Sequence, residues 1–180
     1  TRESLAALAE ELPAVAAALQ RFTYDRMLQN LMIRNPLFRP FTRAQQRDLL
    51  RRFTSHDVVP GTVIINEGDP GTGLFLVLSG AVEVAKGGGD ESTPLATLRA
   101  GEVFGEMSLL RQEAATATVV ASEQSTVLFL SRDYVDRMVA NIPAVREYLA
   151  ALAEDRELDT QLALASDDEA EDDGSVVIFF

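Results

Sequence analysis

The spacing of turn residues between residues 54 and 131 most constrains how this chain folds. Apolar and β-branched runs there are short, and each ends at a pair or cluster of turn-forming residues, mostly glycine, proline, serine and aspartate. Strands are predicted at 62–66, 74–78, 81–86, 94–98, 103–104, 116–121 and 126–130. Many short strands at this spacing predict a sandwich, a barrel or a jelly roll.

Helical patterns precede this β segment. Apolar residues recur at alternating steps of three and four between residues 5 and 22, which is the spacing of one helix face, and Pro13 is predicted to start a second helix there. Two interpretations stay open for this face: the end of a helical repeat, or a helix packed on its own domain. Further on, Thr42 and Gln45 form a capping box that opens another helix.

Two more helices are predicted after the β segment, so the expected fold class is α+β. Ser131 is a good N-cap for the first of them. The second begins at Pro143, and Leu158 and Leu162 allow it to continue past Asp155.

Negative charge is concentrated at the C-terminal end. The chain has 16 basic and 28 acidic residues, a formal net charge of −12. From Glu154 onward there are ten acidic residues and one arginine, so residues 1–153 hold 18 acidic and 15 basic residues, or −3. An acidic end repels phosphate backbones, so we expect no nucleic-acid partner and a solvated tail.

Several classes of function are disfavoured. The absence of cysteine excludes disulfides and thiolate chemistry, and a single histidine argues against a zinc site or a Ser-His-Asp triad. Dinucleotide-binding, phosphate-loop and nucleophile-elbow motifs are absent, so we expect no enzyme, no metal and no cofactor. No signal peptide and no bilayer-spanning run is present, which favours a cytoplasmic chain without membrane insertion; the first residue is Thr1, and an upstream segment stays an open alternative.

One segment between two predicted strands carries the chemistry of a binding site. Residues 104–110 indicate a short helical turn with Gly105 at its start, and a loop leads on to residues 115–119. The free backbone N–H groups of such a turn suit an anion. Glu106, beside that position, is able to accept hydrogen bonds from sugar hydroxyls.

This segment resembles the phosphate-binding cassette of cyclic-nucleotide-binding domains, which occur in the regulatory subunit of protein kinase A, in catabolite activator proteins and in gated ion channels. The resemblance covers roughly residues 28–152. It also includes Gly61, Glu67-Gly68-Asp69, Gly71, Ser79-Gly80 and Gly101.

The resemblance implies an antiparallel β jelly-roll barrel (a double-stranded β-helix) with an N-terminal helical bundle and C-terminal B- and C-type helices. The expected divisions are a helical segment at 1–23, a cyclic-nucleotide-binding-like domain at 24–153, and a helix extension with an acidic tail and an apolar end at 154–180.

The resemblance also implies roles for matching residues. Gly105 would let the backbone approach the phosphate, and Glu106 would hold the ribose 2′-hydroxyl of cAMP or cGMP. Tyr148 or Leu149 of the last helix would cap the base. The expected ligand contacts are Gly105, Glu106, Met107, Ser108, Ala115, Thr116, Val82 and Val84.

The chain departs from the family pattern at one point. The family has Pro-Arg just before this Thr-Ala-Thr, and the arginine pairs with the cyclic phosphate, whereas Ala114 and Ala115 stand here. A hydrogen bond to a charged group is worth about 1.5–3 kcal/mol, so its loss weakens binding roughly ten- to a few hundred-fold. Arg111 in the same loop is a candidate substitute; the alternative is a surface arginine facing solvent.

Three functional hypotheses remain. The first is a regulatory domain that senses cAMP, cGMP or another small anion weakly or atypically. The alternative is a degenerate member acting as a protein-interaction or oligomerisation module, with a protein partner or a second copy expected in either case. The third, a transcription factor, is disfavoured because acidic residues stand where a helix-turn-helix is needed.

The apolar end at 175–180 has two interpretations. It is expected to dock at a sheet edge, in a groove or in a vacant ligand pocket; the alternative is a docked terminal strand or the stub of a longer chain.

Overall fold

The chain folds as an antiparallel β sandwich of the jelly-roll type with helices before, within and after it. The computed structural model describes residues 13–87 and 92–171. One sheet has the order β1 (Thr54–Val58), β8 (Ser125–Ser131), β3 (Gly73–Ser79), β6 (Val103–Phe104). The other has the order β2 (Val63–Ile65), β7 (Thr118–Ala121), β4 (Ala81–Lys86), β5 (Thr93–Arg99). The expected jelly roll is thus confirmed, as two four-stranded sheets that do not close into a barrel within the described residues.

Strand β3 is buried on both faces, which explains its continuous apolar sequence. Alternate residues of a strand point to opposite sides of the sheet. Phe75 and Val77 therefore lie in the core between the two sheets, with Val82 of β4 and Val119 of β7. The intervening leucines of β3 face the other way and pack against the helices: Leu74, Leu76 and Leu78.

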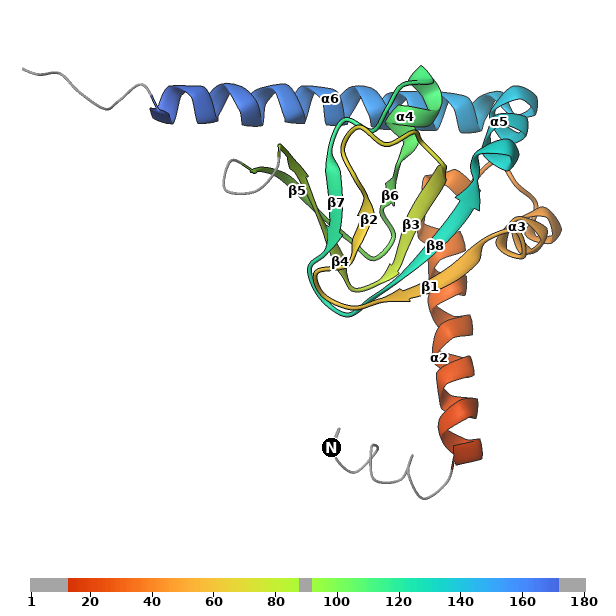
Figure 1. Ribbon diagram of the computed structural model, residues 1–180. Helices are drawn as coiled ribbons and strands as arrows, with labels where there is room; N and C mark the ends of the chain where they lie inside the picture. The colour runs from red at the N-terminus through yellow and green to blue at the C-terminus, as the bar shows by residue number, and fades with distance from the viewer. Residues whose placement is uncertain (1–12, 88–91, 172–180) are drawn as a thin grey trace, which may run out of the picture.

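The helices form a second layer on the outer face of β3 and across one end of the sandwich (Figure 1). They are α2 (Pro13–Arg34), the 3-10 helix η1 (Pro36–Phe38), α3 (Arg43–Leu50), α4 (Glu106–Arg111), α5 (Arg132–Asn141) and α6 (Pro143–Glu171). Leu37 and Phe38 of η1 are fully buried among them, so this short turn anchors the N-terminal helices to the body.

The apolar face predicted for the N-terminal helix is only partly used. The second half of α2 packs on the body through Leu31, which is buried. The first half projects away from the sandwich in Figure 1, and its apolar side chains Val15, Leu19 and Phe22 are exposed. Residues 1–12, which hold the rest of the predicted face, lie outside the described residues.

Local signals in the sequence set the helix ends. Thr42 accepts a hydrogen bond from the backbone of Gln45 while the Gln45 side chain accepts one from the backbone of Thr42, which confirms the capping box. Ser131 is the N-cap residue of α5, although its side chain makes no capping hydrogen bond. The break before Pro143 is confirmed as well, because α5 ends at Asn141 and α6 begins at Pro143.

Helix α6 is one continuous helix of 29 residues that lies across the end of the sandwich (Figure 1). The predicted continuation past Asp155 is confirmed. The divisions expected at 23/24 and 153/154 fall inside α2 and α6, and the apolar segment 175–180 lies outside the described residues. Within the described residues, no helix has the length and apolar character needed to cross a membrane.

Candidate functional site

The site is built around the short helix α4, which follows β6 through a sharp turn. Gly105 is the N-cap residue, with φ of 83°, a left-handed conformation that favours glycine. A Cβ atom at Gly105 would lie 2.8 Å from the backbone oxygen of Gly73, at the start of β3. The turn therefore requires glycine for its conformation and for its close approach to β3.

A cavity of about 330 Å³ lies between this turn, the strands of the second sheet and α6. This volume falls within the range of about 300–1,000 Å³ found for small-molecule sites. Its wall is apolar on the sheet side, with Ile65, Val84 and Val119, and polar where α4 and α6 approach each other.

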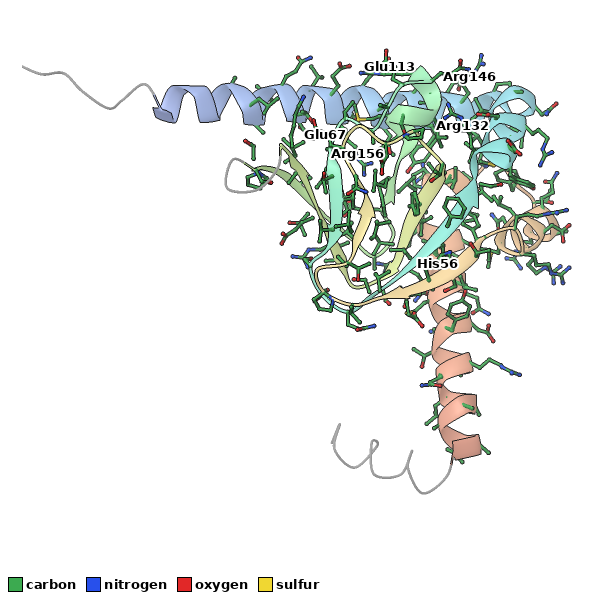
Figure 2. All side chains as sticks on the ribbon, viewed as in Figure 1. His56, Glu67, Glu113, Arg132, Arg146 and Arg156 are labelled. Carbon is green, nitrogen blue, oxygen red and sulfur yellow. The ribbon has the colours of Figure 1, made fainter. Side chains whose placement is uncertain are left out.

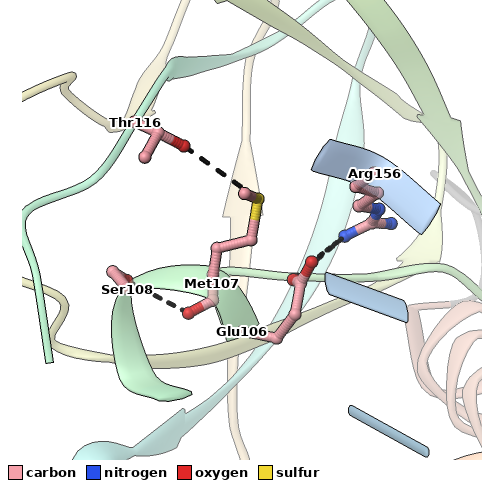
Figure 3. Close-up of polar contacts among 6 residues, drawn as sticks. Glu106, Met107, Ser108, Thr116 and Arg156 are labelled. Carbon is pink, nitrogen blue, oxygen red and sulfur yellow. Dashed lines mark hydrogen bonds and ion pairs between the residues drawn. The ribbon is translucent and has the colours of Figure 1, made fainter. Parts of the chain in front are cut away.

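The carboxylate of Glu106 is buried and is bound by an arginine from α6 (Figure 3). The Glu106 side chain is 1% exposed and that of Arg156 is 20% exposed. Nη1 of Arg156 donates to both carboxylate oxygens of Glu106, at 2.9 and 3.0 Å. Since a buried carboxylate without a partner is costly, this pair fixes α6 over the mouth of the cavity.

A second ion pair joins α4 to α6 outside the cavity. Arg111, the last residue of α4, donates two hydrogen bonds to the carboxylate of Glu157. The hydrogen bond to Glu157 raises the pKa of the Arg111 guanidinium. Arg111 is thus an exposed arginine whose guanidinium is held on α6 by Glu157, and it is not among the described residues of the cavity wall.

The loop before β7 is fixed by backbone hydrogen bonds. The N–H of Ala115 donates to the carbonyl of Asp69 at 2.8 Å, and its carbonyl accepts from the N–H of Gly68 at 2.8 Å. Thr116 lies beside α4, with its hydroxyl 4.0 Å from the sulfur of Met107 (Figure 3). Ala115 reaches the cavity wall but presents only a methyl group there.

The structure brings most of the predicted ligand contacts together. The following predicted contacts line the cavity beside α4: Gly105, Glu106, Met107, Ser108, Ala115, Thr116 and Val84. Val82 differs from its expected place, because its side chain is fully buried in the core between the sheets and does not reach the cavity wall.

The part of α6 over the cavity lies further along the helix than expected. Leu149 is fully buried in the helical core, and Tyr148 is partly buried beside it, so neither lines the cavity. Burial raises the pKa of the Tyr148 phenol. The lining residues from α6 begin one helical turn later: Leu152, Asp155, Arg156, Asp159 and Thr160.

Sequence reasoning missed Arg156. Its partner Glu106 is 50 residues away, so no local pattern joins them. One signal was present: Arg156 is the single basic residue among the ten acidic residues from Glu154 onward. A lone cation in an acidic stretch is a candidate for a specific partner.

Acidic side chains dominate the charge of the cavity wall. Among the described lining residues, Arg156 is the one base, and the acids are Glu102, Glu106, Asp155 and Asp159. An anion that enters such a cavity meets net repulsion unless the guanidinium of Arg156 faces it.

Comparison with known proteins agrees with this fold. Residues 55–141 match the family described as cyclic nucleotide-binding domain. A cyclic AMP receptor protein of Thermus thermophilus is 38% identical over 141 residues, which cover 76% of this chain and 64% of that protein. A cAMP-dependent protein kinase regulatory subunit of Yarrowia lipolytica is 35% identical over 123 residues, covering 68% of this chain and 31% of that protein.

Among solved structures, the catabolite activator protein of Thermus thermophilus superposes with a TM-score of 0.63 at 36% identity, covering 73% of this chain and 63% of that chain. This chain therefore spans less than two thirds of each of these three relatives. The fold and the α4 turn define a β-sandwich domain with a cavity of small-molecule size. Through residues 55–141, the chain belongs to the cyclic nucleotide-binding domain family.

Replacing Gly105 with alanine tests the close approach of the α4 turn to β3. Gly61 has the same φ of 83°, but no atom lies within 4 Å of a Cβ placed there. We expect Gly61→Ala to cost about 1–2 kcal/mol for its backbone conformation alone. Gly105→Ala should cost clearly more, since it also meets the backbone oxygen of Gly73. Urea unfolding measures both, and equal losses would contradict this account.

Replacing Arg156 with glutamine tests the buried ion pair. Because Glu106 is left buried without its cation, we expect a loss of about 1–3 kcal/mol in the free energy of unfolding. Arg111→Gln is the matched control, since it breaks an exposed pair with the same helix and should cost less than about 1 kcal/mol. Chemical denaturation measures the free energy of unfolding of both variants. A larger loss in Arg111→Gln would contradict our assignment of the Arg156–Glu106 pair as the more stabilising one.

Proposed function

We propose that this chain is a regulatory domain that binds a cyclic nucleotide, cAMP or cGMP, or another small anionic ligand, more weakly than a site with its own cassette arginine. The single observation that carries the proposal is the buried Glu106 carboxylate at the start of α4, facing a cavity of suitable volume. A carboxylate there accepts hydrogen bonds from sugar hydroxyls, and the apolar wall suits a purine base.

The proposed contacts follow the walls of the cavity. The α4 turn at Gly105 and Glu106 would receive the sugar and phosphate, with Met107 and Ser108 in its first turn and Thr116 opposite. Val84 and Ile65 would contact the base. Binding would act through α6, which closes the cavity and pairs with Glu106. We place this role in the cytoplasm, without catalysis and without nucleic acid.

Weak affinity is part of the proposal. Ala115 presents a methyl group where the family resemblance implies an arginine, and its backbone N–H already donates to Asp69. The absence of one charged hydrogen bond lowers affinity roughly ten- to a few hundred-fold.

A titration of wild type and Ala115→Arg with cAMP and cGMP tests the proposal. Nucleotide at about ten times its Kd should stabilise the fold by about 1.4 kcal/mol, which raises Tm by about 3–6 °C. Ala115→Arg should tighten binding by at least about tenfold. Differential scanning calorimetry and isothermal titration calorimetry measure the two effects.

Ala17→Arg, which adds the same charge on the exposed part of α2, is the control and should bind as wild type does. If neither wild type nor Ala115→Arg responds to either nucleotide, the proposed binding of a cyclic nucleotide is wrong.

A second candidate is a protein-interaction or oligomerisation module that binds no nucleotide. One observation favours it: Arg156 already occupies the carboxylate that a sugar would need, in a cavity with an acidic wall. On this hypothesis the partner is another protein or a second copy of the chain.

Deleting residues 166–180 tests the second candidate. If the tail mediates assembly, the shortened chain should lose its oligomeric state or its capture of a partner, as measured by sedimentation and by pull-down. The double variant Asp167→Asn and Asp168→Asn is a milder control, since it removes two negative charges from the tail and keeps its length. Unchanged assembly after the deletion would argue against this role of the tail.

A further inference from the structure

The next inference rests on the proposed function and concerns how its site binds an anion. We propose that Arg156 of α6 is the anion-binding cation of the cavity. On this proposal a sugar hydroxyl of the ligand takes over the Glu106 carboxylate, and the released guanidinium turns to the anionic group of the same ligand.

The charge of the cavity wall supports this role. Four carboxylates and one guanidinium line the cavity among the described residues, and that guanidinium belongs to Arg156. A buried anion needs a nearby opposite charge or several hydrogen bonds. Arg111 is less suited to this purpose because it does not line the cavity and pairs with Glu157 outside it.

The hydrogen-bond geometry of Arg156 leaves it capable of a second partner. A guanidinium has five N–H donors on three nitrogens. In the described part of the chain only Nη1 is used, and it donates to both oxygens of Glu106. The side chain is 20% exposed and lines the cavity, so it is not locked in the core.

Because of the position of Glu106, the Arg156 guanidinium has only a short distance to move from that carboxylate to an anion at the α4 turn. Glu106 is the first residue of α4, immediately after the Gly105 turn, so a guanidinium that touches its carboxylate is already beside that turn. A hydroxyl donor on Glu106 competes with the single nitrogen that Arg156 now uses. An anion held near the turn then offers the guanidinium a new partner. The Arg156 side chain reaches that partner by rotating about its own bonds, which requires less backbone movement than a shift of the whole helix.

The pairing also couples the ligand to α6. Arg156 and its neighbour Glu157 tie the helix to both ends of α4, through Glu106 and Arg111. Exchange of the first pair leaves the second intact. The helix would therefore turn about the Arg111–Glu157 contact as the ligand binds, rather than leave the cavity.

Calorimetric titration of cAMP and of cGMP into wild type and three variants, each with all 180 residues, tests the role of Arg156. We expect Arg156→Gln to weaken binding by about tenfold to a hundredfold, and Arg156→Lys, which keeps the charge, to weaken it only a few-fold. Arg146→Gln is the matched control, since it removes one positive charge from the outer side of the same helix (Figure 2) and should bind as wild type does.

A double-variant comparison separates ligand binding from a structural role. In Ala115→Arg, a second cation serves the same anion, so adding Arg156→Gln should cost much less affinity than it does in the wild-type background. A purely structural role of Arg156 would cost the same in both backgrounds. Circular dichroism of each protein checks that it is folded at the titration temperature.

Each outcome decides the inference. If Arg156→Gln binds nucleotide as tightly as wild type or more tightly, Arg156 only competes for Glu106 and the inference is overturned, while the proposed function stands. If Ala115→Arg binds and wild type does not, the site is a nucleotide site that Arg156 fails to complete, and the inference again fails. If none of the proteins binds either nucleotide, the proposed nucleotide binding and this inference both fail.

Discussion

The burial of β3 on both faces is the constraint on which the rest of the structure depends. Phe75 and Val77 join the two sheets, while the leucines between them hold the helices against the sandwich. The same strand starts at Gly73, whose carbonyl oxygen lies so near the α4 turn that a Cβ at Gly105 would be only 2.8 Å from it. The turn that presents Glu106 is therefore held by the most buried strand of the protein, so the carboxylate has a fixed position.

That fixed carboxylate sets the electrostatics of the site. Burying the Glu106 carboxylate is costly without a partner, and in this chain the partner is a cation from α6 rather than from the loop before β7. Helix α6 thus both covers the cavity and carries the arginine that neutralises Glu106. A ligand that competes for Glu106 acts directly on the docking of α6, because it changes the partner of Arg156.

Much of the fold could be predicted from the sequence because its signals are local. The capping box at Thr42, the break before Pro143 and the glycine at 105 each specify a backbone conformation within a few residues. Only part of the cavity wall could be predicted from the family resemblance: the α4 turn, Val84 and the loop at Ala115 and Thr116.

The rest depends on contacts between distant residues. The pairing of Arg156 with Glu106 spans 50 residues, and where α6 crosses the cavity depends on how it packs on α5 and η1. The first half of α2 shows the same limit, since its regular apolar face does not reveal whether the rest of the domain covers that face.

Beyond Arg156, α6 continues to Glu171, about 22 Å at 1.5 Å per residue. A slight tilt at the cavity is therefore magnified along this rigid arm, so the far end of the helix would sweep a larger arc than any atom near the ligand.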